Sequence, residues 1–140
     1  MAKKINNPEI NYAGFWSRFV ALIIDVICGN VISFVIGFAL ALLIGAETTK
    51  QLSTVLGITI GWFYYAWMES KYGATLGKQV LDLKVTDING GPITFLQATG
   101  RHFAKLLSIG TLFIGFIMAG LTKKKQGLHD IVSECLVVKK

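Results

Sequence analysis

The stretch that decides the fold runs from Phe15 to Ile44 and reads FWSRFVALIIDVICGNVISFVIGFALALLI. A helix rises about 1.5 Å per residue, so this apolar run is long enough to cross a hydrocarbon core about 30 Å thick. We therefore predict that residues 15–44 form a first transmembrane helix.

Two charged residues lie inside this predicted helix, Arg18 and Asp25. Seven residues at about 100° each bring them to one helix face, about 10 Å apart along the axis. A charged side chain at membrane depth costs at least about 2.5–3.5 kcal/mol on insertion scales. We therefore expect this face to contact protein or a wet cavity, and not lipid.

Composition places the chain among integral membrane proteins. Its 140 residues have the length of one domain, with 53% hydrophobic residues, 16% charged residues and a mean hydropathy of +0.57. The basic N-terminus precedes an apolar run too long for a cleaved signal, so we expect it to be retained. The net charge of +6 comes from basic residues that flank the apolar segments, which a positive-inside bias explains without a nucleic-acid partner.

A second apolar segment predicts a returning helix. Residues 45–51 suit a short outside turn, and residues 52–68 carry no charge. This segment ends in aromatic residues expected to share the leaflet of Trp16: Trp62, Tyr64, Tyr65 and Trp67. The first two helices would then form a hairpin.

Gly57 and Gly61 form a G-x-x-x-G pattern in the second predicted helix. Small residues at this spacing allow a neighbouring helix to approach closely. We predict packing within the hairpin, with a dimer interface as the alternative.

Residues 69–105 form a polar, basic loop that we place in the cytoplasm. Apolar and polar residues alternate over Leu81–Val85, which predicts a short strand, and Cys135–Val138 has strand composition too. We expect these two segments to pair. Thr94 and Gln97 have capping-box spacing, and predict the start of an interfacial helix that carries Arg101, His102 and Lys105.

The third apolar stretch, residues 106–121, is marginal for a crossing because sixteen residues make a helix of about 24 Å. It either crosses the membrane or re-enters. We favour re-entry, which keeps the basic tail, residues 122–140, in the cytoplasm with the N-terminus.

These segments predict one all-α membrane domain over residues 1–140. It contains a helical hairpin, a third membrane-embedded segment that we take as re-entrant, and a small cytoplasmic β-element. We expect a multi-pass protein of the cell membrane with a cytoplasmic N-terminus.

Two motifs that suggest chemistry do not support it. The segment from Gly73 to Lys78 is one residue short of a phosphate-binding loop, and Gln79 stands where Ser or Thr would hold magnesium. Its glycines more simply bend the chain out of the second helix.

His129 and Asp130 lack the further ligands that a zinc or catalytic site needs, and Cys28 and Cys135 are isolated thiols. We expect no metal, no cofactor and no enzymatic catalysis.

Three separated motifs resemble the RDD family of small membrane proteins: RFVALIID at 18–25, GATLGKQVLDLKV at 73–85 and GLHDIVSECLVV at 127–138. The Arg and two Asp of that family's name correspond to Arg18, Asp25 and Asp130. Cys135 stands where family members usually have Thr. The resemblance implies a cell-membrane protein, with transport proposed and cation/proton exchange suggested for some members.

Physical reasoning assigns roles to these charged residues. Helix side chains tilt toward the N-terminus, so Arg18 points away from Asp25 and needs a partner from elsewhere, with Glu69 and Asp130 as candidates. Asp25 lies about two turns deeper, where Tyr64 or Tyr65 of the returning helix supplies the nearest polar group. It is then protonated, hydrated or cation-bound. The alternative is that Arg18 and Asp130 lock the fold while Asp25 is a hydrogen-bonded structural residue.

Two functional hypotheses follow. The first is a transporter or cation/proton exchanger subunit in which Asp25 alternately holds a proton and a monovalent cation. Three segments are few for a pathway, so it requires a homo-oligomer in the lipid bilayer, packed through Gly57 and Gly61. The second is an accessory protein that binds and regulates a larger membrane enzyme or complex and needs no ion site.

Overall fold

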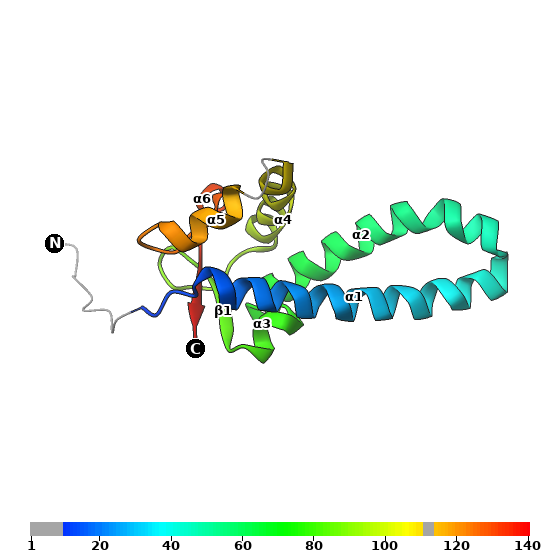
Figure 1. Cartoon of the computed structure of the whole chain (residues 1–140), viewed down its shortest axis with the longest axis horizontal. Helices are drawn as coiled ribbons and strands as arrows, with labels where there is room; N and C mark the ends of the chain where they lie inside the picture. Colours follow the sequence, from blue (N-terminus) through cyan, green and yellow to red (C-terminus); the bar gives the residue numbers. More distant parts are fainter. Residues whose placement is uncertain (1–9, 111–113) are drawn as a thin grey trace.

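The computed structural model describes residues 10–110 and 114–140, in which a long helical hairpin projects from a cluster of shorter elements (Figure 1). The elements follow in the order α1 (Phe15–Ile44), α2 (Ala46–Tyr72), α3 (Leu76–Val80), β1 (Leu83–Asp87), α4 (Phe95–Gly110), α5 (Ile114–Leu121), α6 (Leu128–Val132) and β2 (Cys135–Lys139). We call the part of the molecule outside the hairpin, from α3 onward, the base.

α1 has the bounds that the sequence predicts, and its 30 residues form the one helix of the described chain that is long and apolar enough to cross a membrane. Most of its apolar side chains point outward, and Leu43 is 80% exposed. Such a surface suits lipid and not water. The buried residues of α1 are Ala21 and Asp25, which face the base.

The connection between α1 and α2 is shorter than predicted. Residues 45–51 were expected to form a turn, but α2 begins at Ala46 and the reversal takes place at Gly45, whose φ is 88°. Glycine adopts this angle without steric cost, so one residue is enough. Glu47 then lies in the first turn of α2, where a negative charge stabilises a helix N-terminus.

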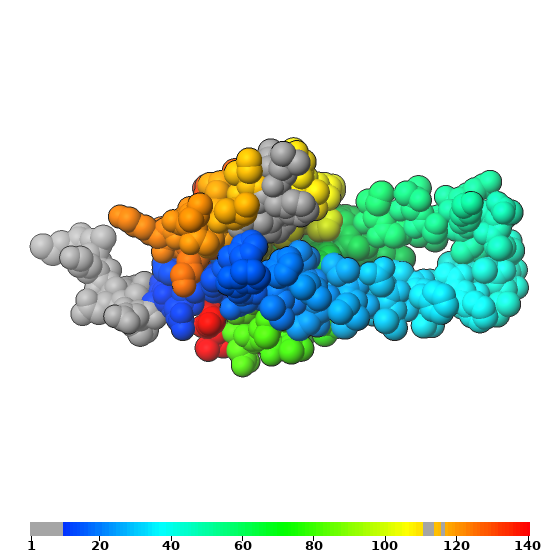
Figure 2. Space-filling view, in the orientation of Figure 1, coloured from blue at the N-terminus to red at the C-terminus, as the bar shows by residue number. Residues whose placement is uncertain are grey.

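The predicted packing of the G-x-x-x-G pattern within the hairpin is wrong. A Cβ built on Gly57 or Gly61 would have no neighbour within 4 Å, so neither glycine is needed for an approach between α1 and α2. The two helices leave a hollow between them instead, visible between the arms of the hairpin in Figure 2.

The two glycines of residues 73–78 act in different ways. Gly73 has a φ of 72° and ends α2 in the left-handed conformation, as a chain bend at this point requires. Gly77 allows a close approach: a Cβ at this position would lie 2.1 Å from the carbonyl oxygen of Ala21. α3 therefore packs against the backbone of α1.

β1 and β2 pair in an antiparallel two-stranded sheet with Val85 opposite Val137, which confirms the predicted pairing. The predicted start of the first strand at Leu81 is wrong. The amide of Leu81 donates to the carbonyl of Lys78, and Asp82 has a φ of 53°, so these residues form a turn between α3 and β1. Four side chains from this sheet belong to the buried hydrophobic core: Leu83, Val85, Cys135 and Val137.

The capping box that starts α4 is present. The amide of Gln97 donates to Thr94 Oγ1 over 3.2 Å, and the amide of Thr94 donates to Gln97 Oε1 over 2.9 Å. This exchange satisfies donors that a helix start leaves free.

The third apolar stretch is not one helix. Residues 106–110 end α4 and residues 114–121 form α5, while residues 111–113 lie outside the described part of the chain. α4 and α5 are separate helices that contact each other. The eight residues of α5 make a helix of about 12 Å, too short to cross a bilayer.

Candidate functional site

A buried network of charged side chains joins the hairpin to the base. Its centre is Arg101 on α4, which is 2% exposed. Its Nη1 donates to Glu69 Oε2 on α2, and its Nε donates to Asp130 Oδ1 on α6, both over 2.8 Å. One guanidinium therefore holds two carboxylates from two other helices, a geometry that lysine cannot reproduce.

Arg18 extends this network to α1. The predicted pair with Asp130 is present, and Arg18 Nε also donates to the carbonyl of Ala13 over 3.1 Å. Glu69, the other predicted partner of Arg18, bonds elsewhere: it pairs with Lys78 of α3, and Lys105 Nζ lies 3.6 Å from its Oε1. The charge network is defined by six residues: Arg18, Glu69, Lys78, Arg101, Lys105 and Asp130.

The charged side chains around Asp130 change the pKa values of their neighbours. Burial would raise the pKa of Asp130, but the guanidiniums of Arg101 and Arg18 outweigh it and hold that pKa well below its usual range. Burial lowers the pKa of His129 to about 3 although Asp130 is adjacent, so the imidazole is neutral at pH 7. The two arginines are therefore the main groups that keep Asp130 ionised.

Lys78 is the cation of the network that is easiest to neutralise. Burial, together with the charge of Arg101, lowers its pKa to about 7 against the attraction of Glu69. Lys78 follows Thr75 and Gly77, which bind a second buried carboxylate. The segment 73–78 thus connects two charged regions.

Asp25 lies at this second region. Its carboxylate accepts hydrogen bonds from Thr75 Oγ1 over 2.6 Å, from the amide of Gly77 over 2.8 Å and from the Tyr64 hydroxyl over 3.4 Å. The side chain is buried, and no basic side chain of the described residues forms a salt bridge with it. Asp25 is therefore solvated by hydrogen-bond donors alone.

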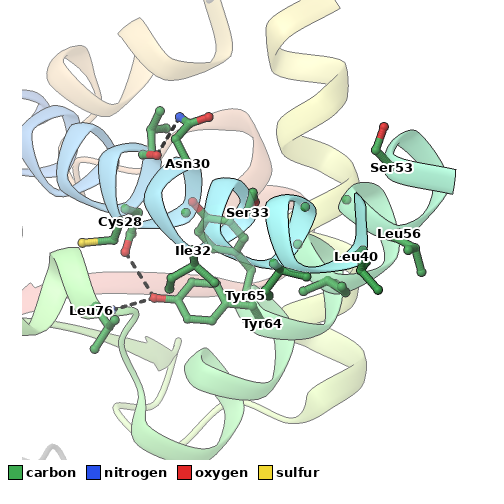
Figure 3. A pocket seen from close by; sticks show the side chains of 18 of the residues that line it. Cys28, Asn30, Ile32, Ser33, Leu40, Ser53, Leu56, Tyr64, Tyr65 and Leu76 are labelled. Carbon is green, nitrogen blue, oxygen red and sulfur yellow. Dashed lines mark hydrogen bonds between the residues drawn. The ribbon is translucent and has the colours of Figure 1, made fainter. Parts of the chain in front are cut away.

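A cavity of about 380 Å³ extends from Asp25 between α1 and α2. Figure 3 shows Tyr64 and Leu76 at one end of it and Ser53 and Leu56 at the other. Its walls are mostly apolar, with polar groups from both helices: Asn30, Ser33, Thr49, Ser53, Tyr64 and Tyr65. Asp25 is thus a buried carboxylate at the base end of a partly polar cavity.

The two predicted tyrosines behave differently. Tyr64 reaches Asp25, as expected, and its hydroxyl also accepts the amide of Leu76 over 3.2 Å. Tyr65 forms no hydrogen bond with Asp25. Its ring lies 5.5 Å from that of His102, and Lys105 Nζ lies 4.9 Å from its centroid. Tyr65 therefore belongs with the cations of α4.

Sequence reasoning missed the roles of Arg101 and Lys105, which it placed at the membrane interface. Both point inward to Glu69. The signal was present, because Arg101 shares the spacing of small residues that form the buried face of α4, Ala98, Ala104 and Ser108. A basic residue on such a face predicts a buried acidic partner.

The arrangement at Asp25 can hold a proton or a small cation. The carboxylate oxygens and the hydroxyl oxygens of Thr75 and Tyr64 are hard oxygen donors of the kind that alkali and other hard cations prefer. Among the described residues, no three His, Cys, Asp or Glu side chains gather as they would around a transition metal.

Comparison with known proteins agrees with the membrane character of α1. The chain is 37% identical to a Bacillus subtilis (strain 168) protein named "Uncharacterized protein YxaI", over 91% of this chain and 97% of that relative. It is 27% identical to "Uncharacterized membrane protein YteJ" of the same organism, over 91% of this chain and 80% of that relative. No solved structure matches it. The family model described as "RDD family" matches residues 12–134, so the chain belongs to the RDD family and is a membrane protein.

Proposed function

We propose that this protein is a subunit of a small transporter or cation/proton exchanger, in which Asp25 alternately holds a proton and a monovalent cation. One observation supports this most strongly: a buried carboxylate without a salt bridge among the described residues faces a cavity between α1 and α2, the two long helices of the hairpin. Ionisable groups inside membrane segments are costly, and they commonly mark ion or proton pathways.

The proposal includes a topology. α1 and α2 cross the membrane as a hairpin, and the N-terminus, residues 69–105 and the tail lie in the cytoplasm. Positive-inside bias supports this topology. Lys50 is the only Lys or Arg of the described residues near the tip of the hairpin, and the others lie at the opposite end. The pair of Arg18 and Asp130 supports it too, since the two residues must share one side of the membrane.

Labelling tests this topology. In a Cys28→Ser, Cys135→Ser background, a Lys124→Cys variant should not react with an impermeant thiol reagent in intact cells and should react after lysis. Reaction in intact cells would place the tail outside and contradict the topology.

A homo-oligomer is part of the proposal, because one hairpin encloses too little space for a pathway. Gly57 and Gly61 line the cavity and have no neighbour within 4 Å of a built Cβ, so they leave room for a helix of a second copy. In the oligomer, the cavity between α1 and α2 would become the wall of a shared passage.

The test in membranes uses inside-out vesicles that contain the protein, with an acid interior built by respiration and a pH-sensitive dye. Addition of Na⁺, K⁺ or Li⁺ should release the dye quench for at least one cation. Asp25→Asn should abolish that response. Asp87→Asn is the matched control, since Asp87 also accepts backbone amides, those of Asn89 and Gly91, but lies in a turn of the base. Equal responses of Asp25→Asn and wild type would refute a role for Asp25.

The second candidate is an accessory protein that regulates a larger membrane complex. The base favours it in one respect, because apolar side chains of three different segments are more than half exposed there: Val80, Ile88 and Val132. This candidate predicts no flux by the purified protein.

A further inference from the structure

The segment 73–78 lies at the base end of the cavity. Leu76 lines the cavity, and Thr75 and Gly77 on either side of it are buried against Asp25. Figure 3 shows Leu76 beside the Tyr64 hydroxyl, at the end opposite the tip of the hairpin. A small solute that moves past Leu76 between the cavity and the base side would contact residues 75–77.

Contacts other than those with Asp25 hold the ends of this segment. Gly73 accepts the amide of Val85 over 2.6 Å, Gln79 Nε2 donates to the carbonyl of Ala74 over 3.0 Å, and Lys78 pairs with Glu69. The start of the segment is therefore anchored to β1 and to Gln79, and its end, which is the first turn of α3, is anchored to α2. Residues 75–77 between them bind Asp25 and Tyr64 of the hairpin, while the carbonyl of Thr75 also accepts the amide of Gln79 in α3.

All three groups that bind Asp25 act as donors to it. An ionised carboxylate strengthens such bonds about twofold over neutral ones, so the charge of Asp25 holds the segment in place. A proton on Asp25 removes that charge, and a cation on its oxygens competes with the amide of Gly77, which cannot act as a ligand. Occupation of Asp25 and closure by residues 75–77 therefore oppose each other.

We propose that Thr75, Leu76 and Gly77 form a gate at the base end of the cavity, which ionised Asp25 holds shut and which opens when Asp25 is neutralised. Thr75 is the positioning residue of this gate, because its hydroxyl makes the shortest bond to Asp25. The inference rests on the proposed function and adds a conformational step to it. Binding of a proton or a cation at Asp25 opens the site toward the cytoplasm.

Other ionisable groups near Asp25 do not replace it in this role. Tyr64 and Tyr65 face it from α2, Cys28 lies one turn further along α1, and Lys105 of α4 is near enough to interact with its charge. Lys105 and Tyr65 contact each other and not the gate. Neutralisation of Asp25 therefore changes the charge that the gate residues contact directly.

Cys28 provides a natural reporter, because it lines the cavity and is half-buried, while Cys135 is fully buried. The measurement is the rate at which a cationic, water-soluble methanethiosulfonate modifies Cys28 in the purified full chain with Cys135→Ser, well below its melting temperature. Its fixed charge disfavours entry through apolar surfaces. Thr75→Val and Asp25→Asn should each raise this rate, by about tenfold if the net strength of one to two hydrogen bonds is lost.

Two controls isolate the hydroxyl of Thr75. Thr75→Ser should keep the rate of the parent, because the donor remains. Thr86→Val makes the same exchange at a buried threonine of β1 whose hydroxyl has no partner among the described residues, and it should leave the rate unchanged. Rates of Thr75→Val and Asp25→Asn within twofold of the parent would overturn the gate, as would an equal rise in Thr75→Ser.

The labelling result and the flux result are separable. Faster modification in Thr75→Val and Asp25→Asn without any flux in wild type would leave the gate standing and refute transport. Flux that depends on Asp25, with unchanged Cys28 rates, would refute the gate and leave transport standing.

Discussion

Replacement of Arg101 by methionine tests the charge network most severely. Arg101→Met keeps an unbranched side chain of similar length but removes the cation that bridges Glu69 and Asp130 at 2.8 Å each. Breaking a buried ion pair costs about 3–5 kcal/mol, because it leaves an uncompensated charge. Asp130 keeps Arg18 and Glu69 keeps Lys78, so the lower end of this range, about 3 kcal/mol, is the expected loss.

The assay is a thermal melt of the purified protein in detergent. For a chain of this size, a loss of about 3 kcal/mol corresponds to a melting temperature lower by roughly 12 °C. Lys124→Met removes an exposed positive charge of the base and should change stability by less than about 0.5 kcal/mol. Arg101→Lys should lie between the two, since an ammonium cannot hold both carboxylates in the planar geometry. A melting temperature of Arg101→Met within about 2 °C of wild type would refute the network as the link between hairpin and base.

Three further predictions concern stability. Gly77→Ala should lower the free energy of unfolding by about 1–3 kcal/mol, because its Cβ would collide with the backbone of Ala21. Gly57→Ala should be neutral or raise it by up to about 1 kcal/mol. Equal melting temperatures of the two variants would contradict this packing. The pKa of Asp130 is lower in the folded state, so the unfolded chain binds the proton first as the pH falls. The contribution of ionised Asp130 to stability is therefore present above about pH 4 and is lost as the pH falls through the lower pKa of the folded state. A melting temperature that is level from pH 4 down to 2 would contradict this. Arg18→Ala, Asp130→Ala and the double variant should show a coupling of about 1–3 kcal/mol, and additive losses would mean that the pair does not interact in solution.

Local patterns in the sequence predicted the elements that depend on local physics. The bounds of α1 follow from its apolar length, and the start of α4 follows from Thr94 and Gln97. The pairing of β1 with β2 followed from two short segments that could not bury their apolar sides alone. In each case, the residues that determine the element lie within that element or directly before it.

The contacts that build the site depend on non-local packing, and the sequence did not reveal them. Thr75 and Gly77 bind Asp25 from fifty residues away, and one of these donors is a backbone amide, which has no residue-specific signal. Arg101 was placed on an interfacial helix, because basic residues crowd one portion of that helix and apolar residues continue beyond it. Its buried position became clear only when α2, α4 and α6 were seen to converge.

The hairpin shows how a valid pattern can mislead about its partner. Gly57 and Gly61 have the spacing of a helix-packing motif, yet α1 does not pack on them. The prediction from the sequence assumed that the adjacent helix, α1, is the partner of these glycines. The space beside these glycines is open, and our proposal places a helix of another copy there.

The central claim is that Asp25 carries an ion or proton across the membrane, and flux through purified protein tests it most directly. The protein is reconstituted in liposomes with a trapped pH dye, and a gradient of the cation identified in vesicles is imposed. We predict proton movement in wild type above that of empty liposomes, and its loss to the empty-liposome rate in Asp25→Asn at equal protein content. Wild-type liposomes that are no faster than empty ones, or Asp25→Asn as fast as wild type, would contradict the claim.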